Sequence, residues 1–295
     1  MFTKTGATFI TALGTPLDEQ GELLEDSFRK HINHQLEHGI DSFLVMGSMG
    51  AMVCLKRSAY VDCARAAADE VAGKVKVMVG VGDNSIEQTT ERIDLLKGLP
   101  IDAVTATTPY YFPSTQSDLV YYFSAIADYS PFPLYLYDLP QITKVKIELE
   151  TALKLSQHPN IFGAKCSHEA VYVRNLARLT ADNDFEVIHG QLDLVDVFLS
   201  YGITVNVDGF FAVTAKWVQE IKEAFAVKDM ESVSRIQQKI TDLRQEFIDL
   251  GVFPTFTVAM NRLGFEGRFH PSHMAPMAES DYSKVFGWLE QAELV

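Results

Sequence analysis

The chain has 295 residues, of which 47% are hydrophobic, and it carries a formal net charge of −14. A chain of this length and apolar content can bury a large core, which excludes intrinsic disorder. The negative charge, without any basic cluster, argues against nucleic acid and anionic membranes as partners. We therefore expect a cytoplasmic protein that acts on a small molecule.

The sequence contains no segment that predicts export or membrane insertion. No run approaches the roughly 18 consecutive apolar residues that a membrane-spanning helix requires, and the start, Met1–Lys4, lacks the apolar core of a secretory signal. The cysteines Cys54, Cys63 and Cys166 stand in unrelated contexts without CxxC spacing. We therefore expect reduced thiols, no disulfide framework and no metal site.

Short β-rich runs alternate with amphipathic segments, which is the pattern of repeated βα units on a parallel sheet. The eight predicted strands are Ala7–Leu13, Ser42–Gly47, Lys76–Val81, Ala103–Thr108, Pro133–Leu139, Ile161–Cys166, Phe185–His189 and Val205–Phe210. The helices predicted between and after them are Leu24–Gly39, Ser58–Ala72, Ile86–Leu99, Ser117–Tyr129, Glu148–His158, Ala170–Ala181, Leu192–Gly202 and Ala215–Val227. Ser85, Thr115 and Thr214 are the predicted N-caps, and Gly39 and Gly202 are the predicted left-handed residues after helices.

Eight such pairs favour a (β/α)8 TIM barrel over residues 1–229. A doubly wound open sheet is the alternative, but it would bring a Gly-rich fingerprint after the first strand, and Ala12–Pro16 is not one. Beyond about residue 229 the β-rich runs stop, and Met230–Leu250, Pro254–Leu263 and Asp281–Ala292 predict helices. We therefore expect a small C-terminal helical extension over residues 230–295, packed on the barrel.

A lone lysine stands near the end of the sixth predicted strand. Lys165 follows the apolar run Ile161–Ala164, and Tyr137 stands 28 residues earlier, at the end of the fifth run. Ends of parallel strands share one rim, so both side chains should project there. Partial desolvation lowers the pKa of a lysine, and the free amine can then attack a carbonyl to form a Schiff base. A strand-end lysine that merely reaches solvent is the alternative.

Two further features follow predicted strands. Gly47–Gly50 is a small-residue loop whose backbone amides suit a carboxylate, although a plain turn is the alternative. Tyr110 and Tyr111 follow the fourth strand. Two tyrosines and a serine of this rim can form a proton relay, because a phenol needs a partner to act as acid or base at neutral pH. Aromatic packing under a loop is the alternative for at least one of Tyr110 and Tyr111.

The order Ser48, Tyr111, Tyr137 with Pro140, and Lys165 resembles the N-acetylneuraminate lyase and dihydrodipicolinate synthase family of class I aldolases. The resemblance covers essentially the whole chain. It implies a (β/α)8 barrel with a helical tail, usually a homotetramer. It also implies action on pyruvate or a longer 2-oxo acid through an imine on Lys165, without a metal or an organic cofactor.

The resemblance also implies roles for individual residues. Backbone amides at Ser48 and Met49, in the loop that Gly47 opens, would hold the substrate carboxylate. Tyr137 would be the general acid and base, relayed through Ser48 to Tyr111, which in this family commonly comes from the neighbouring subunit. The substrate-binding residues expected at the eighth strand are Val207 and Gly209.

Departures from the family pattern narrow the expected reaction. Met49 and Ala51 replace a second hydroxyl residue and an acid, which removes a side-chain donor for the carboxylate and makes the pocket more apolar. Ile142 replaces an arginine that synthase members carry, so synthase activity is disfavoured. Leu192 replaces one carboxylate associated with sialic acid lyases. We expect a lyase that cleaves or forms a C–C bond in a 2-keto-3-deoxy sugar acid. Dehydration of such an acid through the same imine, or a keto-acid sensor without turnover, is the alternative.

Four other residues have structural explanations. Cys166 should point away from the Lys165 side of its strand, because side chains alternate. His168 and Glu169 are expected to cap the start of a helix. His270 is expected in a structural turn of the C-terminal tail.

Overall fold

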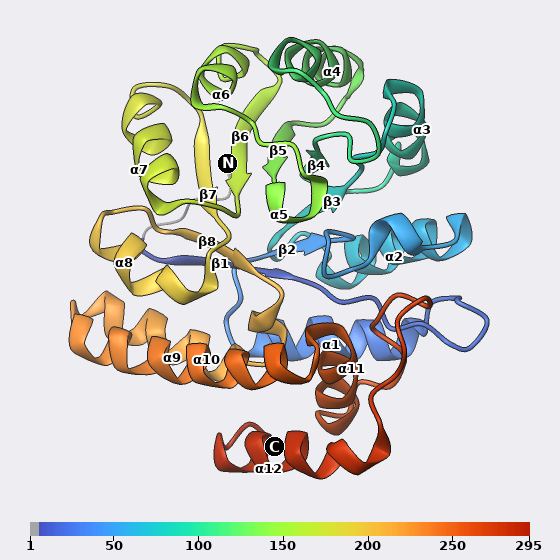
Figure 1. Cartoon of the computed structure of the whole chain (residues 1–295), viewed down its shortest axis with the longest axis vertical. Coiled ribbons are helices and arrows are strands. Elements are labelled where there is room, and N and C mark those ends of the chain that lie inside the picture. The colour runs from blue at the N-terminus through green and yellow to red at the C-terminus, as the bar shows by residue number, and fades with distance from the viewer. Residues whose placement is uncertain (1–5) are drawn as a thin grey trace.

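The computed structural model describes residues 6–295 and contains a closed barrel of eight parallel strands (Figure 1). Each strand pairs with the next, and β8 pairs with β1. The predicted (β/α)8 fold is confirmed and the open sheet is excluded. The strands are β1 Thr8–Ala12, β2 Ser42–Val45, β3 Lys76–Gly80, β4 Ala103–Thr107, β5 Leu134–Asp138, β6 Ile161–Cys166, β7 Glu186–His189 and β8 Val205–Asp208.

Helices follow the strands and surround the barrel (Figure 1). They are α1 Glu25–Glu37, α2 Arg57–Val71, α3 Ile86–Leu96, α4 Gln116–Tyr129, α6 Leu149–Leu155, α7 Ala170–Leu179, α8 Val195–Ser200 and α9 Ala215–Ala226. A short helix that the sequence pattern did not predict, α5 Pro140–Thr143, follows β5. In the described part of the chain, no helix is long and apolar enough to cross a membrane. Met1–Lys4, where a secretory signal was sought, lies outside the described residues.

Several predicted boundaries are wrong by a few residues for local reasons. β2 ends at Val45 because Met46 has a left-handed backbone with φ 55°. β8 ends at Asp208 because its carboxylate accepts a hydrogen bond from the backbone amide of Phe210 (2.8 Å), which begins a 3-10 turn. The predicted helix Leu192–Gly202 is divided into a 3-10 turn and α8.

The predicted N-caps are confirmed for Ser85 and Thr115 but not for Thr214, and both predicted left-handed glycines are confirmed. Ser85 and Thr115 cap α3 and α4 through their hydroxyls, and Gly39 and Gly202 have positive φ of 71° and 78°. The expectation for Thr214 is wrong, because its hydroxyl donates backwards to the carbonyl of Phe210 (3.0 Å) and leaves no cap at the start of α9.

The strands bury two different sets of side chains because successive residues point to opposite faces. One set faces the helices and forms the larger core, which includes Cys166, as predicted. The other set fills the barrel interior with Ile10, Ala12, Leu44, Met78, Ala103, Tyr135, Ile188, Val205 and Val207. This interior is a packed core and closes the barrel below the functional rim.

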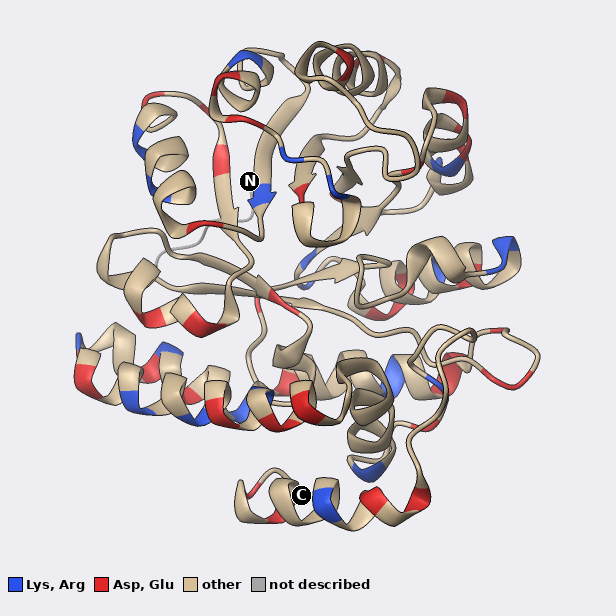
Figure 2. Cartoon of the chain, viewed as in Figure 1, with Lys and Arg blue, Asp and Glu red and all other residues tan. Residues whose placement is uncertain are grey.

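Three helices follow the barrel, and the first of them packs on it. They are α10 Met230–Leu250, α11 Val252–Arg262 and α12 Tyr282–Gln291. α10 contacts α8 and α9, α11 contacts α10, and α12 contacts α11. Lys, Arg, Asp and Glu lie mainly on the outer helices and connecting loops (Figure 2). The proposed boundary at residue 229 falls between α9 and α10, which pack against each other.

Candidate active site

Lys165 and Tyr137 lie side by side inside the mouth of the barrel. Strand pairing aligns Tyr137 with Lys165 and also aligns Thr107 with Tyr137, so these side chains form one layer across β4 to β6. Lys165 is only 5% exposed. Its Nζ lies 3.9 Å from the centroid of the Tyr137 ring. The lysine is therefore enclosed at the rim, contrary to the alternative that it reaches solvent.

Tyr137 connects this layer to the loop after β2. Its phenol oxygen lies 2.8 Å from Oγ of Ser48, and either hydroxyl can donate. Tyr137 is buried, whereas Ser48 is partly exposed. The pair therefore provides a path for a proton between the buried amine and the outer part of the site.

The loop after β2 has a constrained backbone. Met46 and Ala51, at its two ends, have positive φ values of 55° and 52°, a conformation that non-glycine residues adopt rarely and often at functional sites. A Cβ on Gly50 would lie 2.9 Å from Cα of Met46, so a larger residue does not fit there. Within the described chain, the backbone amides of Ser48 and Met49 donate no hydrogen bond. Such a loop can accept an anionic group.

Met49 extends from this loop across the barrel mouth toward the end of β8. A Cβ added to Gly209 would lie 2.6 Å from Cγ of Met49, so glycine makes room for the methionine. Met49 also packs on the interior cluster that contains Val207. Burial raises the pKa of Asp208, between Val207 and Gly209, while the hydrogen bond from the Phe210 amide and the nearby charge of Lys165 oppose that shift. The end of β8 is therefore covered by an apolar side chain.

Tyr111 is not brought to Ser48 within this chain. Its side chain is 77% exposed and contacts Phe112, with ring centroids 4.9 Å apart. Tyr110 is half-buried, and its hydroxyl donates to the carboxylate of Asp83 (3.1 Å). Burial and the Asp83 charge raise the pKa of Tyr110. Of the three residues of the predicted relay, the structure brings Tyr137 and Ser48 together and leaves the Tyr111 ring exposed.

Asp138 and His168 form a buried pair that was missed in the sequence. His168 Nε2 is hydrogen-bonded to Oδ2 of Asp138, and Oδ1 accepts from the backbone amide of Ile147 (3.1 Å). The Asp138 carbonyl accepts from the amide of Ser167 (3.0 Å). Glu169 stands at the N-cap position of α7, as expected, but no side chain makes a capping hydrogen bond there, and His168 bonds to Asp138 instead. The sequence does contain a signal for this pair, because Asp138 directly follows Tyr137 and His168 stands soon after Lys165.

A cavity of about 260 Å³ opens beside Tyr137 and Ser48. Gly47 also lines it, but Lys165, Met49, Val207 and Gly209 do not. The C-terminal extension contributes side chains to its wall that the sequence did not identify. These are Phe253, Pro271, His273 and Met274. Because Tyr137 contacts the Lys165 amine and also lines this cavity, the cavity adjoins the lysine.

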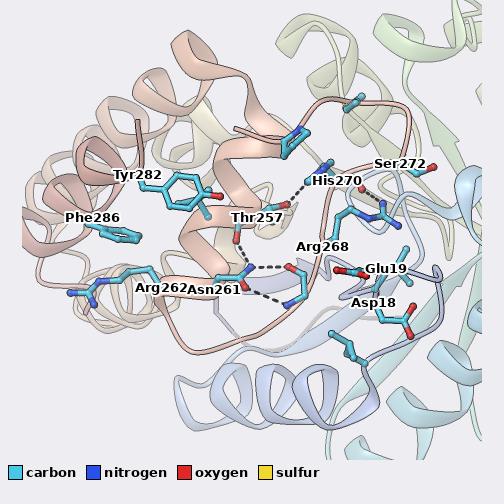
Figure 3. Close-up of a pocket in the computed structure, with 16 residues that line it drawn as sticks. Asp18, Glu19, Thr257, Asn261, Arg262, Arg268, His270, Ser272, Tyr282 and Phe286 are labelled. Atoms are coloured by element: carbon cyan, nitrogen blue, oxygen red, sulfur yellow. Dashed lines mark hydrogen bonds between the residues drawn. The ribbon is translucent and has the colours of Figure 1, made fainter. Parts of the chain in front are cut away.

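A second cavity of about 820 Å³ lies between the loop after β1 and helices α11 and α12 (Figure 3). Carboxylates of Asp18 and Glu19 and the guanidinium of Arg268 lie around it (Figure 3). Nδ1 of His270 is hydrogen-bonded to Oγ1 of Thr257 (2.9 Å), which anchors the segment after α11, in keeping with a structural role. Tyr137 and Ser48 line the smaller cavity and not this one, so the smaller cavity is the candidate active site. Among residues 6–295, no cluster of His, Cys, Asp and Glu is arranged to hold a metal ion.

Comparisons with known proteins agree with this geometry. Residues 6–292 match the dihydrodipicolinate synthetase family. The chain is 33% identical over 235 residues to the 4-hydroxy-tetrahydrodipicolinate synthase of Exiguobacterium sibiricum, an alignment that covers 78% of each chain. It is similar to the dihydrodipicolinate synthase of Cyanidioschyzon merolae, solved with lysine bound, with a TM-score of 0.90, 26% identity and coverage of 99% of this chain and 100% of that chain. A 2-keto-3-deoxygluconate aldolase variant of Sulfolobus solfataricus has a TM-score of 0.89 at 20% identity, covering 97% and 96% of the two chains, which shows a shared fold.

Proposed function

Because the chain belongs to the dihydrodipicolinate synthetase family of class I aldolases, we propose that it is a lyase that uses Lys165 to form a Schiff base. The substrate is a 2-oxo acid, and pyruvate is the product of cleavage or the donor in synthesis. The observation that carries this proposal is the enclosed Lys165 amine on the ring of Tyr137, whose hydroxyl lies 2.8 Å from Ser48.

These groups can support each step of the reaction. The lysine amine attacks the 2-oxo carbon, water leaves, and a protonated imine forms. When the C3–C4 bond breaks, its electron pair moves into the imine and gives an enamine, while Tyr137 takes the proton of the C4 hydroxyl and an aldehyde leaves. The enamine is then protonated at C3, and water releases pyruvate and the free amine. In the reverse direction the same groups join pyruvate to an aldehyde.

The substrate carboxylate is proposed to bind the backbone amides of Ser48 and Met49. Both amides donate to no group in the described chain and stand on a loop of small residues, which supports this role. The family resemblance suggests a homotetramer, in which Tyr111 completes the relay of a neighbouring subunit. The exposed ring of Tyr111 is consistent with that arrangement. A cytoplasmic location stays a prediction.

The proposed reaction differs from the one in the relatives' names in the aldehyde that takes part. Those that match in sequence include 4-hydroxy-tetrahydrodipicolinate synthases. Ile142, which is 59% exposed at the edge of the cavity, offers no cation to a second carboxylate, so we infer a different partner. A 2-keto-3-deoxy sugar acid was the expectation from the sequence. Dehydration of such an acid uses the same imine and is the second candidate reaction.

Exchange of the methyl hydrogens of pyruvate with deuterium tests turnover without knowledge of the aldehyde. Enamine formation removes a C3 proton, so the native protein should catalyse exchange that is visible by NMR. Lys165→Ala should abolish exchange, and Tyr137→Phe should slow it about 100-fold or more, because it removes the acid and base. Exposed Tyr121→Phe is the matched control and should leave the rate unchanged.

The same experiment separates an enzyme from a sensor. A keto-acid sensor would bind pyruvate through Lys165 and would show no difference in exchange between the native protein and Tyr137→Phe. Exchange that persists in Lys165→Ala would contradict the proposed chemistry.

A further inference from the structure

The cavity beside Tyr137 has an apolar wall. Side chains from four separate parts of the chain meet there. They belong to the turn after the β2 loop, the segment after β5, α11 and the segment after α11, and they are Met52, Val53, Leu139, Ile142, Phe253 and Met274. Of the described residues that line the cavity, none is a lysine or an arginine. A ligand in this space would therefore bury its surface mainly against hydrocarbon and thioether groups.

Most hydroxyl groups in the wall already have partners within the protein. Thr105 donates to the carbonyl of Tyr135 (3.0 Å), and Thr143 donates to the carbonyl of Leu139 (3.2 Å). Tyr110 donates to Asp83, as described above. A polyhydroxylated chain would therefore lose hydrogen bonds to water on entering the cavity and regain few of them.

Cations near the cavity are also engaged elsewhere. Arg92 forms an ion pair with Asp83 (2.7 Å) and donates to the carbonyl of Gly82 (2.6 Å). The amine of Lys144 donates to the carbonyl of Gln141 (2.7 Å). Lys146 pairs with Glu169 (3.3 Å). A second carboxylate deep in the cavity would therefore meet no lysine or arginine of the described chain that is free to pair with it, since His273 is exposed in the wall, and its desolvation would be unfavourable.

We propose that the aldehyde that adds to pyruvate, or leaves from the 2-oxo acid, is uncharged and apolar, with an alkyl chain or a single aromatic ring. This inference rests on the proposed function and replaces the sugar-acid expectation. Size agrees with it, because an apolar cavity of about 150 Å³ can hold benzene, and this cavity measures about 260 Å³. The reaction is balanced: C3 of the enamine bonds to the aldehyde carbon, Tyr137 protonates the aldehyde oxygen, and hydrolysis releases a 4-hydroxy-2-oxo acid.

Two pairs of aldehydes isolate the chemistry of the distal group. Butanal and succinic semialdehyde share a four-carbon chain, which ends in a methyl group in the first and in a carboxylate in the second. Propanal and glyceraldehyde differ by two hydroxyls. With pyruvate as donor, the native protein should show a kcat/KM at least about tenfold higher for the apolar member of each pair. Benzaldehyde should also be accepted.

Ile142→Arg supplies the missing cation at the edge of the cavity. It should lower the ratio of butanal to succinic semialdehyde at least about tenfold, because the guanidinium can pair with the distal carboxylate. Ile248→Arg is the matched control, since Ile248 is 40% exposed on α10 and does not line the cavity. It should leave the ratio unchanged.

Borohydride reduction with pyruvate alone distinguishes failure of this inference from failure of the proposed function. An adduct on Lys165 together with a preference for the charged or hydroxylated aldehydes would overturn the apolar acceptor alone. An adduct on Lys165 without product from any aldehyde would also overturn the apolar acceptor. No adduct would remove both proposals.

Discussion

Asp138 bonds to three residues in two segments near the site, because its carboxylate contacts His168 and the Ile147 amide and its carbonyl accepts from Ser167. Asp138 directly follows Tyr137, and Ser167 and His168 come soon after Lys165. These bonds therefore fix the ends of β5 and β6 relative to each other. We interpret Asp138 as a positioning residue for the lysine and the tyrosine.

Asp138→Ala should therefore reduce both stability and turnover. It leaves the buried His168 ring and the Ile147 amide without their acceptor, which should lower the free energy of unfolding by about 2–4 kcal/mol. Urea denaturation measures this loss, and pyruvate exchange measures the effect on the site. Asp182→Ala, at an exposed position, should change the free energy of unfolding by less than about 0.5 kcal/mol. Equal stability of the two variants would contradict the role of Asp138.

Sequence reasoning could identify Lys165, Tyr137 and Ser48 because each stands at or just after the end of a β-rich run, and parallel strands bring such ends to one rim. It could not find the contact between Met49 and Gly209, which joins residues far apart in the chain. That contact depends on the rotamer of a flexible side chain across the barrel mouth, and local periodicity does not encode it.

At the scale of elements, α1 contains a histidine that is buried without charge. His31 packs on Phe265, which follows α11, with ring centroids 4.9 Å apart. Burial, with a smaller effect of His34, lowers its pKa from 6.5 to about 3. Burial likewise lowers the pKa of His189, in β7, to about 3.

These histidines should make the protein less stable in mild acid. Between their folded and unfolded pKa values the unfolded chain binds more protons, so the free energy of unfolding falls as the pH falls below about 6.5. Each histidine should remove about 1.4 kcal/mol between about pH 7.5 and pH 5.5. In urea denaturation, His31→Leu should reduce the total pH dependence by that amount. An unchanged pH dependence in this variant would contradict the buried neutral state of His31.

The existence and order of the elements could be predicted because apolar runs and amphipathic segments differ in period. Their ends could not, since β8 is ended by a side chain that bonds the backbone at Phe210 and α5 is a single helical turn. The contribution of α11 and the segment after it to the cavity also depended on tertiary packing. Nothing in the local pattern of Phe253 or Met274 distinguishes a cavity wall from an ordinary core.

At the scale of the whole molecule, Tyr111 predicts that the site is shared between subunits. If each site combines its own Lys165 with the Tyr111 of a neighbour, Lys165→Ala and Tyr111→Phe chains are each impaired but complement each other. In a mixed pair, one site retains both residues and the other loses both. Each mixed pair should therefore retain about half of native pyruvate exchange.

Co-expression of the two variants with different affinity tags, followed by purification through both tags, measures this complementation. If Tyr111 acts within its own chain, every site in a mixed pair lacks one residue, and no activity above that of the separate variants returns. Tyr201→Phe, another exposed tyrosine, should not impair exchange in the homogeneous protein.

Borohydride reduction in the presence of pyruvate, followed by mass mapping of the peptides, tests the imine on Lys165 most directly. We expect a single reduced adduct on the peptide that contains Lys165, present in Tyr137→Phe and absent in Lys165→Ala. An adduct on another lysine, or no adduct on the folded native protein, would contradict Schiff-base chemistry at this site.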